Sequence, residues 1–295
     1  SSVTGMSSMF SSAGYSATTW NIGDLSEWDT SSVTSMYYMF AYAGYTATTW
    51  TIGDLSTWDT SSVTTMDNMF NYAGYSATTW SIGDLSEWDT SSVTDMSNMF
   101  AYAGYSATTW NIGDLSEWNT SSVTDMSSMF RSAGYSATTF NIGDLSEWNT
   151  SSVTTMSRMF SYAGYNATTW NSIGTLKIYA DNVRGMFYNC PKAKATLLIY
   201  NKPTYYTSSS NSDKMFNSAA TTDDALITVF YSSAVDNIDD IIATKSENSH
   251  VVKGGLLGTD YTITLNPNGE NESVNPTSLT ITPGQPYGEL PTPTT

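Results

Sequence analysis

The chain has 295 residues, with 14% aromatic and 13% charged side chains and a formal net charge of −17. This many aromatic residues with so few charges exclude a disordered chain. The acidic balance excludes nucleic acid and anionic lipid as main partners. The single cysteine, Cys190, cannot form an intrachain disulfide, and we expect a buried thiol. No apolar run is long enough to span a membrane, so we expect no direct membrane insertion.

One 30-residue unit dominates the chain, and residues 91–120, SSVTDMSNMFAYAGYSATTWNIGDLSEWNT, are one copy of it. The unit recurs without insertion or deletion as far as Trp170. The copies begin at Ser1, Ser31, Ser61, Ser91, Ser121 and Ser151. A single unit cannot bury its apolar side alone, whereas stacked units cover one another, so the repetition predicts a solenoid. Because Ser1 already lies inside the pattern, we expect the chain to be a piece of a longer protein.

The first half of each unit predicts a short helix. Val93, Met96, Met99, Phe100 and Ala103 recur at spacings of three and four residues, which places them on one helical face. A serine or threonine precedes this segment and can cap it, and a glycine follows that can end it. Three intervening positions vary between copies, so we expect them to be exposed on the outer face. In the fourth copy they are Asp95, Asn98 and Ala101.

The second half of each unit predicts a strand, a corner and a bent extended piece. Trp110 and Ile112 are two residues apart and share one face of a strand. Gly113 interrupts the run. Leu115 and Trp118 are three residues apart, so the chain must bend between them if both side chains point inward. Identical side chains of successive copies should then stack in ladders with a step of about 4.8 Å.

The aromatic ladders are expected to be core packing, with a sugar-binding surface as the alternative. Phe140 keeps a large ring without an indole N–H, which fits packing. The ladders are Trp20, Trp50, Trp80, Trp110, Phe140 and Trp170, and Trp28, Trp58, Trp88, Trp118 and Trp148.

Beyond Trp170 the pattern degenerates. We expect six repeats in 1–170, imperfect coils with a C-terminal cap in 171–258, and a proline-rich, strand-like tail in 259–295 that is too short for a core of its own. Strands are expected at 171–179, 225–231 and 250–257, and a helix with outward acids at 235–242.

The string WDTSSVTDMSNMF, residues 88–100, resembles the W-D-T-S-x-V-T-x-M-x-x-M-F repeats of BspA-like leucine-rich-repeat surface proteins. The resemblance covers residues 1–170, although the usual unit of that family is shorter. Residues 259–295 resemble the first part of an internalin-type B repeat (Listeria–Bacteroides repeat), a stalk module. Together these resemblances imply an extracellular bacterial protein of the cell surface or cell wall. The fold they imply is a right-handed α/β leucine-rich-repeat-like solenoid, with short strands and one short helix per 30-residue coil.

Stacked carboxylates are the ambiguous chemical signal. Asp24, Asp54, Asp84, Asp114 and Asp144 should form one row, in which like charges repel by roughly 1 kcal/mol in water. Backbone N–H groups at the corner would offset this repulsion, and bound calcium is the alternative. The Glu27 row is interrupted by Thr57, which suggests a solvated face. A double threonine row, Thr108 and Thr109 with their equivalents, fits strand propensity, with ice binding as the alternative. His250 is expected to be structural.

We therefore expect a non-enzymatic, monomeric module without cofactor or resident metal. It would bind a host or bacterial surface protein or a glycan through its exposed strand face. The expected contact residues are Ser26, Glu27, Ser56, Ser86, Glu87, Ser116, Glu117, Ser146 and Glu147. The alternative is a rigid architectural spacer without a specific ligand. A dedicated binding site usually appears as a cluster of unusual residues. The main departures from the repeat do not fall in one copy; they are Tyr37, Tyr38, Arg131 and Arg158. The near-identity of the copies therefore favours the spacer, or repeated weak contacts that add up.

Overall fold

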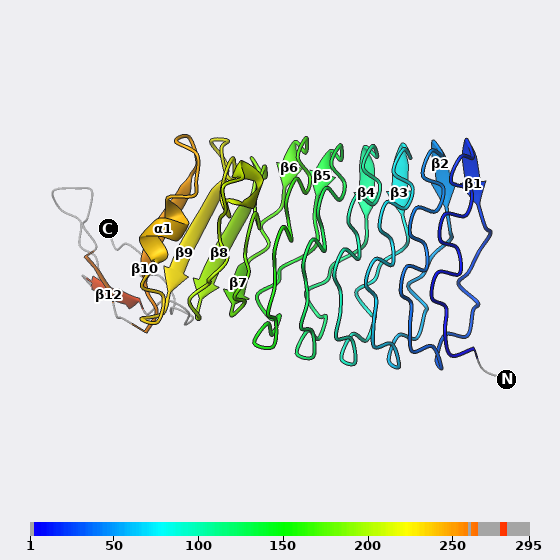
Figure 1. The fold of residues 1–295 in the computed structure, drawn as a ribbon, viewed down its shortest axis with the longest axis horizontal. Coiled ribbons are helices and arrows are strands. Elements are labelled where there is room, and N and C mark those ends of the chain that lie inside the picture. Colours follow the sequence, from blue (N-terminus) through cyan, green and yellow to red (C-terminus); the bar gives the residue numbers. More distant parts are fainter. Residues whose placement is uncertain (1–2, 259–260, 265–277, 282–295) are drawn as a thin grey trace, which may run out of the picture.

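The computed structural model describes residues 3–258, 261–264 and 278–281. Coils of similar shape follow one another along the long axis, so the predicted solenoid is confirmed (Figure 1). Each repeat contributes one short strand. These strands are β1 (Thr19–Asn21), β2 (Thr49–Thr51), β3 (Thr79–Ser81), β4 (Thr109–Asn111), β5 (Thr139–Phe140) and β6 (Thr169–Trp170).

The strands pair in parallel and in register with the repeat. Trp20 lies opposite Trp50, and Trp80 lies opposite Trp110. In each strand the aromatic residue is buried and the threonine before it is exposed. A second row of parallel bridges runs from Gly5 through every repeat to Tyr205. These two rows keep each residue directly above its equivalent, and this alignment creates the side-chain ladders.

The helix predicted in each repeat is wrong. Among the described residues the structure has one α-helix, α1 (Ile238–Ile242), which lies outside the repeats. In the fourth repeat the backbone N–H groups of Asn98 and Phe100 donate to carbonyls of the next coil at 2.8 and 2.9 Å. The N–H groups of Met99 and Ala101 instead donate three residues back within the same coil. An α-helix would use every N–H internally, so this segment joins the coils in a way that a helix cannot.

Alternating backbone handedness produces this arrangement. Asn98 and Tyr102 have φ values of 55° and 59°, in the left-handed region, and Gly104 follows with 53°. Residues in the left-handed conformation alternate with right-handed ones. Successive carbonyls therefore point alternately toward the same coil and toward the neighbouring coil. Met96, Met99 and Phe100 are still fully buried. The three- and four-residue spacing was therefore a correct guide to burial and a wrong guide to backbone conformation.

One of the three variable positions is not on the surface. Ala41, Ala101 and Ser161 are at most 2% exposed, and Asn71 is 9% exposed. Only Ser11 and Arg131 of this row are partly exposed. The expectation that this position faces outward is wrong, because the chain folds back here against its neighbouring coil and leaves room mainly for small side chains.

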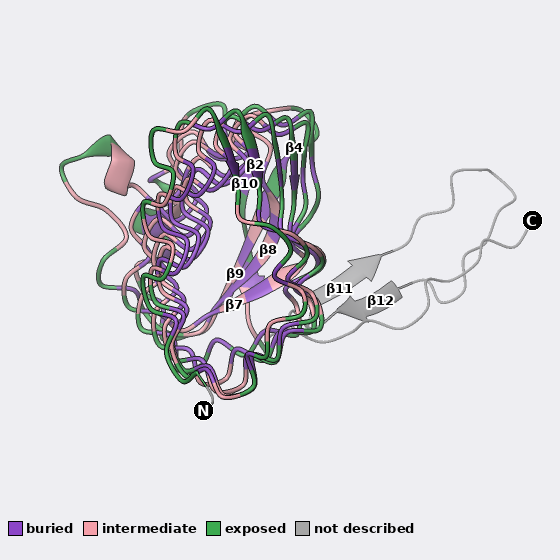
Figure 2. Ribbon diagram, turned by 90° about the vertical axis from the view of Figure 1, so that its right-hand side faces the viewer, coloured by how far each residue is buried: buried purple, intermediate pink, exposed green. Residues whose placement is uncertain are grey.

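The second half of the repeat agrees with the sequence. Ile112, Leu115 and Trp118 are all buried, and the N–H of Trp118 donates to the carbonyl of Leu115 at 3.2 Å. This turn is the predicted bend that brings both side chains inward. Figure 2, which looks along the stack, shows the buried residues lining the inside of the coil.

The degenerate region continues the stack and ends it. A parallel sheet has the order β10-β9-β8-β7. Its strands are β7 (Thr175–Ile178), β8 (Lys194–Ile199), β9 (Leu226–Tyr231) and β10 (Val251–Leu256), and a short 3₁₀ helix covers Asn211–Asp213. The three predicted strands and the predicted helix are thus present, and Asp236, Asp239 and Asp240 are exposed as expected. No helix of the described residues is long and apolar enough to cross a membrane.

Strands β11 (Tyr261–Thr264) and β12 (Ser278–Ile281) pair antiparallel. The remaining residues of the predicted tail lie outside the described residues.

Candidate functional site

The predicted contact row lies on a turn beside the strands, not on the strand face. In the fourth repeat the N–H of Ser116 donates to Asp114 Oδ1 at 2.9 Å. Ser116 is half-buried and Glu117 is exposed, and the same pattern holds in the other repeats. Thr57 replaces glutamate in the second repeat, and its hydroxyl donates to the carbonyl of Ser26 at 2.7 Å. The predicted residues therefore share one edge of the stack, and their contact role stays a prediction.

The adjoining aspartate row is held by backbone N–H groups, as predicted. The Oδ1 atom of each aspartate accepts the N–H of the serine two residues on, at 2.9 to 3.0 Å. The Ser26 backbone N–H, followed by its hydroxyl, lowers the pKa of Asp24. Within the part of the chain that the structure describes, no group of three or more His, Cys, Asp or Glu could hold a metal ion. Hydrogen bonding thus accounts for the row without calcium.

An open hollow of about 520 Å³ lies on this edge, between the first two coils. Asn21, Asp24 and Ser26 line it on one side, and Thr51 and Asp54 on the other. Hydroxyl, amide and carboxylate groups are mixed here, and no histidine, cysteine or lysine lines the hollow. This arrangement presents hydrogen-bond donors and acceptors to solvent.

The tryptophan ladders are core, as predicted. Trp118 and Trp148 stack with 6.4 Å between ring centroids and 2° between planes, and both are at most 2% exposed. The Nε1 of Trp118 donates to the carbonyl of Leu85 in the preceding coil at 2.8 Å. In the other ladder, Phe140 stacks on Trp110 and Trp170 with centroids 5.4 Å apart. Because these rings are covered, they are not a sugar-binding surface.

The two threonine rows differ in their hydrogen bonds. The hydroxyl of Thr78 donates to the carbonyl of Thr48, and that of Thr108 to the carbonyl of Thr78, both at 3.3 Å. The second row points outward from the strands and is exposed in every repeat: Thr19, Thr49, Thr79, Thr109, Thr139 and Thr169. The outward position two residues later changes between asparagine, threonine and serine, so the face is not chemically uniform. Ice binding by this face stays a prediction.

The coils also align a double row of tyrosines that the sequence alone did not reveal, and we call it the tyrosine strip. Adjacent rings of one row are nearly parallel, with centroids 4.2 Å apart for Tyr72 and Tyr102 and 4.4 Å apart for Tyr105 and Tyr135. Tyr15 is 43% exposed and the other members are partly exposed. The strip consists of Tyr15, Tyr45, Tyr75, Tyr105, Tyr135 and Tyr165, and of Tyr42, Tyr72, Tyr102 and Tyr162. The recurrent Gly-Tyr dipeptide was the signal in the sequence.

Stacking determines what the strip can offer. Each ring covers a face of its neighbour, so partners meet mainly ring edges and phenol hydroxyls. Burial is the largest cause that raises the pKa values of Tyr45, Tyr75 and Tyr135. These three phenols therefore stay neutral at physiological pH and can both donate and accept hydrogen bonds.

The strip has one internal gap, in the fifth repeat, in addition to Ser12 at the end of the row in the first repeat. Ser132 stands where four other repeats carry tyrosine, and it is 3% exposed. The neighbouring Arg131 places its guanidinium 5.3 Å from the centroid of the Tyr102 ring, whose outer face would otherwise lack a partner. Arg131 is the only lysine or arginine in the first 150 residues. The serine and the arginine thus act as a coupled replacement for the missing ring.

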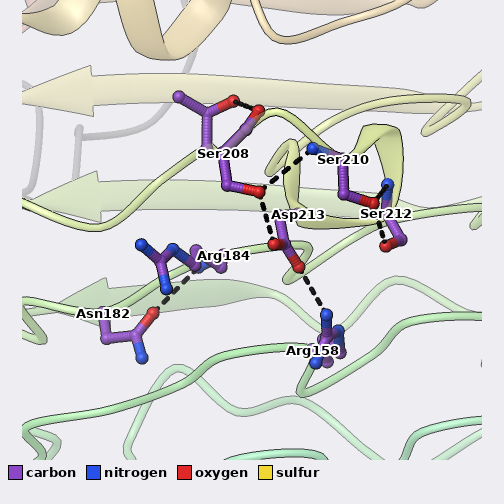
Figure 3. A network of polar contacts seen from close by, with 8 residues as sticks. Arg158, Asn182, Arg184, Ser208, Ser210, Ser212 and Asp213 are labelled. Atoms are coloured by element: carbon purple, nitrogen blue, oxygen red, sulfur yellow. Dashed lines mark hydrogen bonds and ion pairs between the residues drawn. The ribbon is translucent and has the colours of Figure 1, made fainter.

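A polar network fastens the degenerate coils to the last repeat (Figure 3). Asp213 forms an ion pair with Arg158 and accepts the hydroxyl of Ser208 at 2.6 Å. The carbonyl of Asp213 accepts the N–H of Gly185 at 3.0 Å, and the Arg184 guanidinium lies 4.9 Å from the Tyr205 ring centroid. The departure at Arg158 is therefore explained by the junction with the cap.

Cys190 and His250 occupy structural positions. Cys190 is 1% exposed and donates to the carbonyl of Phe160 at 2.7 Å, and burial raises the pKa of its thiol to about 12. His250 Nδ1 lies 3.2 Å from the carbonyl oxygen of Ala225. The buried-thiol prediction is confirmed.

The comparisons with known proteins give one family. A family model described as "Mycoplasma protein of unknown function, DUF285" matches four overlapping stretches, residues 1–101, 44–169, 72–201 and 105–230. Overlapping matches are what a repeated unit produces. No curated protein and no solved structure matches the chain. Since the matched stretches together span residues 1–230 of 295, the chain belongs to the DUF285 family of repeat proteins.

Proposed function

We propose that this chain is a non-enzymatic interaction module of a bacterial cell surface, which holds a protein or glycan along the length of its solenoid. The tyrosine strip is the observation that carries the proposal. Tyrosine offers a large, rigid ring and a hydroxyl at low conformational cost, and it is enriched where proteins contact partners. A repeated strip suits a repeated or extended partner, in which weak contacts add up.

The negative charge around the strip limits the classes of partner that could bind. Fifteen acids and one base in the first 150 residues disfavour a polyanion. A neutral glycan, or a protein segment that is neutral or basic, fits this surface. The predicted row of Ser26, Glu27 and their equivalents would be a second contact edge.

The sequence resemblances support a more detailed proposal for the fold and location. In this proposal the chain is a right-handed, leucine-rich-repeat-like solenoid of BspA type, and it is extracellular and monomeric. The tail that resembles a B repeat would connect the module to the cell wall. The helix expected for such a coil is replaced by turns in this chain, so the kinship lies in the repeat string.

Binding to an array of glycans and extracellular-matrix proteins tests the proposal. We expect the wild-type chain to bind at least one class of partner, and Tyr72→Ser with Tyr102→Ser to weaken that binding. Serine occurs naturally at this position in the first and fifth repeats, as Ser12 and Ser132, so the overall fold should survive, and circular dichroism checks that it does. A matched variant, Glu87→Gln with Glu117→Gln, separates the strip from the turn edge. An absence of binding at every salt concentration would contradict the interaction role.

That negative result would favour the role of a rigid spacer. The uniform hydrogen bonds between coils are consistent with such a role. The N–H of Phe40, Phe70, Phe100 and Phe130 donates to the next coil at 2.8 to 2.9 Å in every case. Junctions this regular make a stiff rod, and stiffness is what a spacer needs.

A further inference from the structure

The tyrosine strip brings oxidisable rings of adjacent coils into contact. Its two closest pairs, Tyr72 with Tyr102 and Tyr105 with Tyr135, have ring planes 8° and 14° apart. The other stacked pairs within the rows have centroids 4.6 to 5.0 Å apart. In the two closest pairs the phenol hydroxyls also hydrogen-bond to each other, so the hydroxyl ends of the stacked rings lie together, on rings that reach solvent.

From the second repeat onward, the more easily oxidised side chains are shielded. Met66, Met96 and Met126 are fully buried, Trp88 is 3% exposed and, beyond the repeats, Cys190 is 1% exposed. In these coils an oxidant in solution therefore meets the tyrosine strip before it meets sulfur or indole, whereas the first repeat also exposes Met9, at 45%. Exposure and thiolate character control oxidation, and Cys190 has neither.

We propose that the tyrosine strip is a site of oxidative modification, at which hydrogen peroxide and a haem peroxidase join tyrosines of adjacent coils into dityrosine. Each of two phenols loses one electron and one proton and becomes a phenoxyl radical. The two radicals form one carbon–carbon bond between their ortho carbons. Each ring then moves its ortho hydrogen to its oxygen and regains aromaticity. The peroxide accepts two electrons and two protons and leaves as two water molecules.

The location of the strip favours coupling within one molecule. A radical formed on one ring has a stacked neighbour in the next coil, and exchange of an electron along the row can bring two radicals together. Burial raises the pKa values of Tyr72 and Tyr105, so each oxidation must release a proton, which bulk water can accept at the partly exposed hydroxyl.

A dityrosine bond would change the mechanics of the stack. A solenoid is held by contacts between nearest neighbours and can open one coil junction at a time. A covalent bond across a junction removes that opening, in the way that a disulfide restricts the unfolded chain. The modified module would resist unfolding from its ends.

The test treats the full chain with hydrogen peroxide and a haem peroxidase and maps cross-linked peptides by mass spectrometry. We expect cross-links between adjacent-coil tyrosines of the strip, with a yield per molecule that does not change on dilution. Tyr72→Phe with Tyr102→Phe keeps both rings stacked but should lose the link between those positions and retain the link between Tyr105 and Tyr135. Tyr205, which is 45% exposed and has no stacked tyrosine in the part of the chain that the structure describes, is the internal control.

Three results would overturn the proposal. The first is the absence of cross-links under conditions that couple free tyrosine. The second is coupling that disappears on dilution, which marks contacts between molecules. The third is coupling confined to tyrosines outside the strip. Partner binding is not needed for any of these outcomes, so the test stands apart from the proposed adhesion.

Discussion

At the scale of single residues, the Ile-Gly-Asp corner shows how one repeat constrains the next. Gly113 has a φ of 83°, and an added Cβ would collide with the Asp84 carboxylate of the preceding coil. That carboxylate is already fixed, because Asp84 Oδ1 accepts the N–H of Ser86 at 3.0 Å. The glycine is thus required both for its backbone conformation and for its lack of a side chain.

Gly113→Ala should therefore destabilise the chain more than Gly23→Ala. Gly23 has a similar φ of 86° but nothing within 4 Å of an added Cβ, because it belongs to the first coil. Both changes incur the cost of about 1–2 kcal/mol for a left-handed alanine. Gly113→Ala adds about 1–3 kcal/mol for the forced displacement of a neighbour. Chemical denaturation followed by circular dichroism measures the difference, and equal losses in both variants would contradict this account.

At the scale of elements, the two tryptophan ladders differ in their use of the indole N–H. In the ladder of Trp118, four indole Nε1 atoms each donate to a leucine carbonyl of the preceding coil at 2.8 to 3.0 Å. In the other ladder the N–H is used unevenly. Nε1 of Trp50 and Nε1 of Trp170 donate to alanine carbonyls of their own coils at 3.0 and 3.3 Å, whereas Nε1 of Trp80 and Nε1 of Trp110 are buried without a hydrogen-bond partner among the described residues. Because the N–H is not always used in this ladder, phenylalanine is accommodated at position 140, while the ladder of Trp118 has tryptophan in each of the first five repeats.

Trp118→Phe should lower the free energy of unfolding by about 1–3 kcal/mol more than Trp80→Phe. Both variants lose similar ring volume from a fully stacked row, but only Trp118→Phe breaks a buried hydrogen bond. Urea denaturation of the two variants, side by side, measures this difference. A larger loss for Trp80→Phe would show that ring size, not the N–H, sets the pattern.

In the turn segment that contains Met96, Met99 and Phe100, the sequence predicted burial but not backbone conformation. Spacing correctly identified the buried Met96, Met99 and Phe100, because burial depends on which side chains face inward. It could not distinguish a helix from alternating turns, since both place every third or fourth residue inside. Asn98, and Asn68 before it, stand at a positive φ, and asparagine tolerates this conformation. These asparagines could be interpreted as left-handed positions only once the hydrogen bonds between coils were known.

At the scale of the whole molecule, the repetition predicted the solenoid and the ladders, because stacking follows from identical units. The candidate site was harder to predict. Glu27 and its equivalents were chosen as exposed polar residues, whereas the tyrosine strip is half-buried and lies in the segment first read as a helix. Recognition of the strip needed the coil-to-coil alignment that places Tyr102 above Tyr72.

Stability should fall as pH rises above about 10, where tyrosines of the unfolded chain ionise. Burial raises the pKa values of Tyr45, Tyr75 and Tyr135 in the folded chain, so those phenols keep protons that the unfolded chain loses. Their contribution is fully present below that pH and is lost as pH rises through the folded pKa values. A series of urea denaturations across this range measures the slope. The triple tyrosine-to-phenylalanine variant should have a shallower slope, and an unchanged slope would count against the phenols.

The register shift in β10 has a consequence for the number of coils in the stack. A stack of like coils has no intrinsic length, because each coil presents the template for another. In β10 the pairing with β9 is regular from Val251 to Lys253 and then slips before Leu256. Lys253 also forms an ion pair with Asp239 at this edge. An irregular, charged edge is a poor template for a further strand. Among the described residues, the stack of parallel coils therefore stops at an edge that disfavours the addition of a further coil.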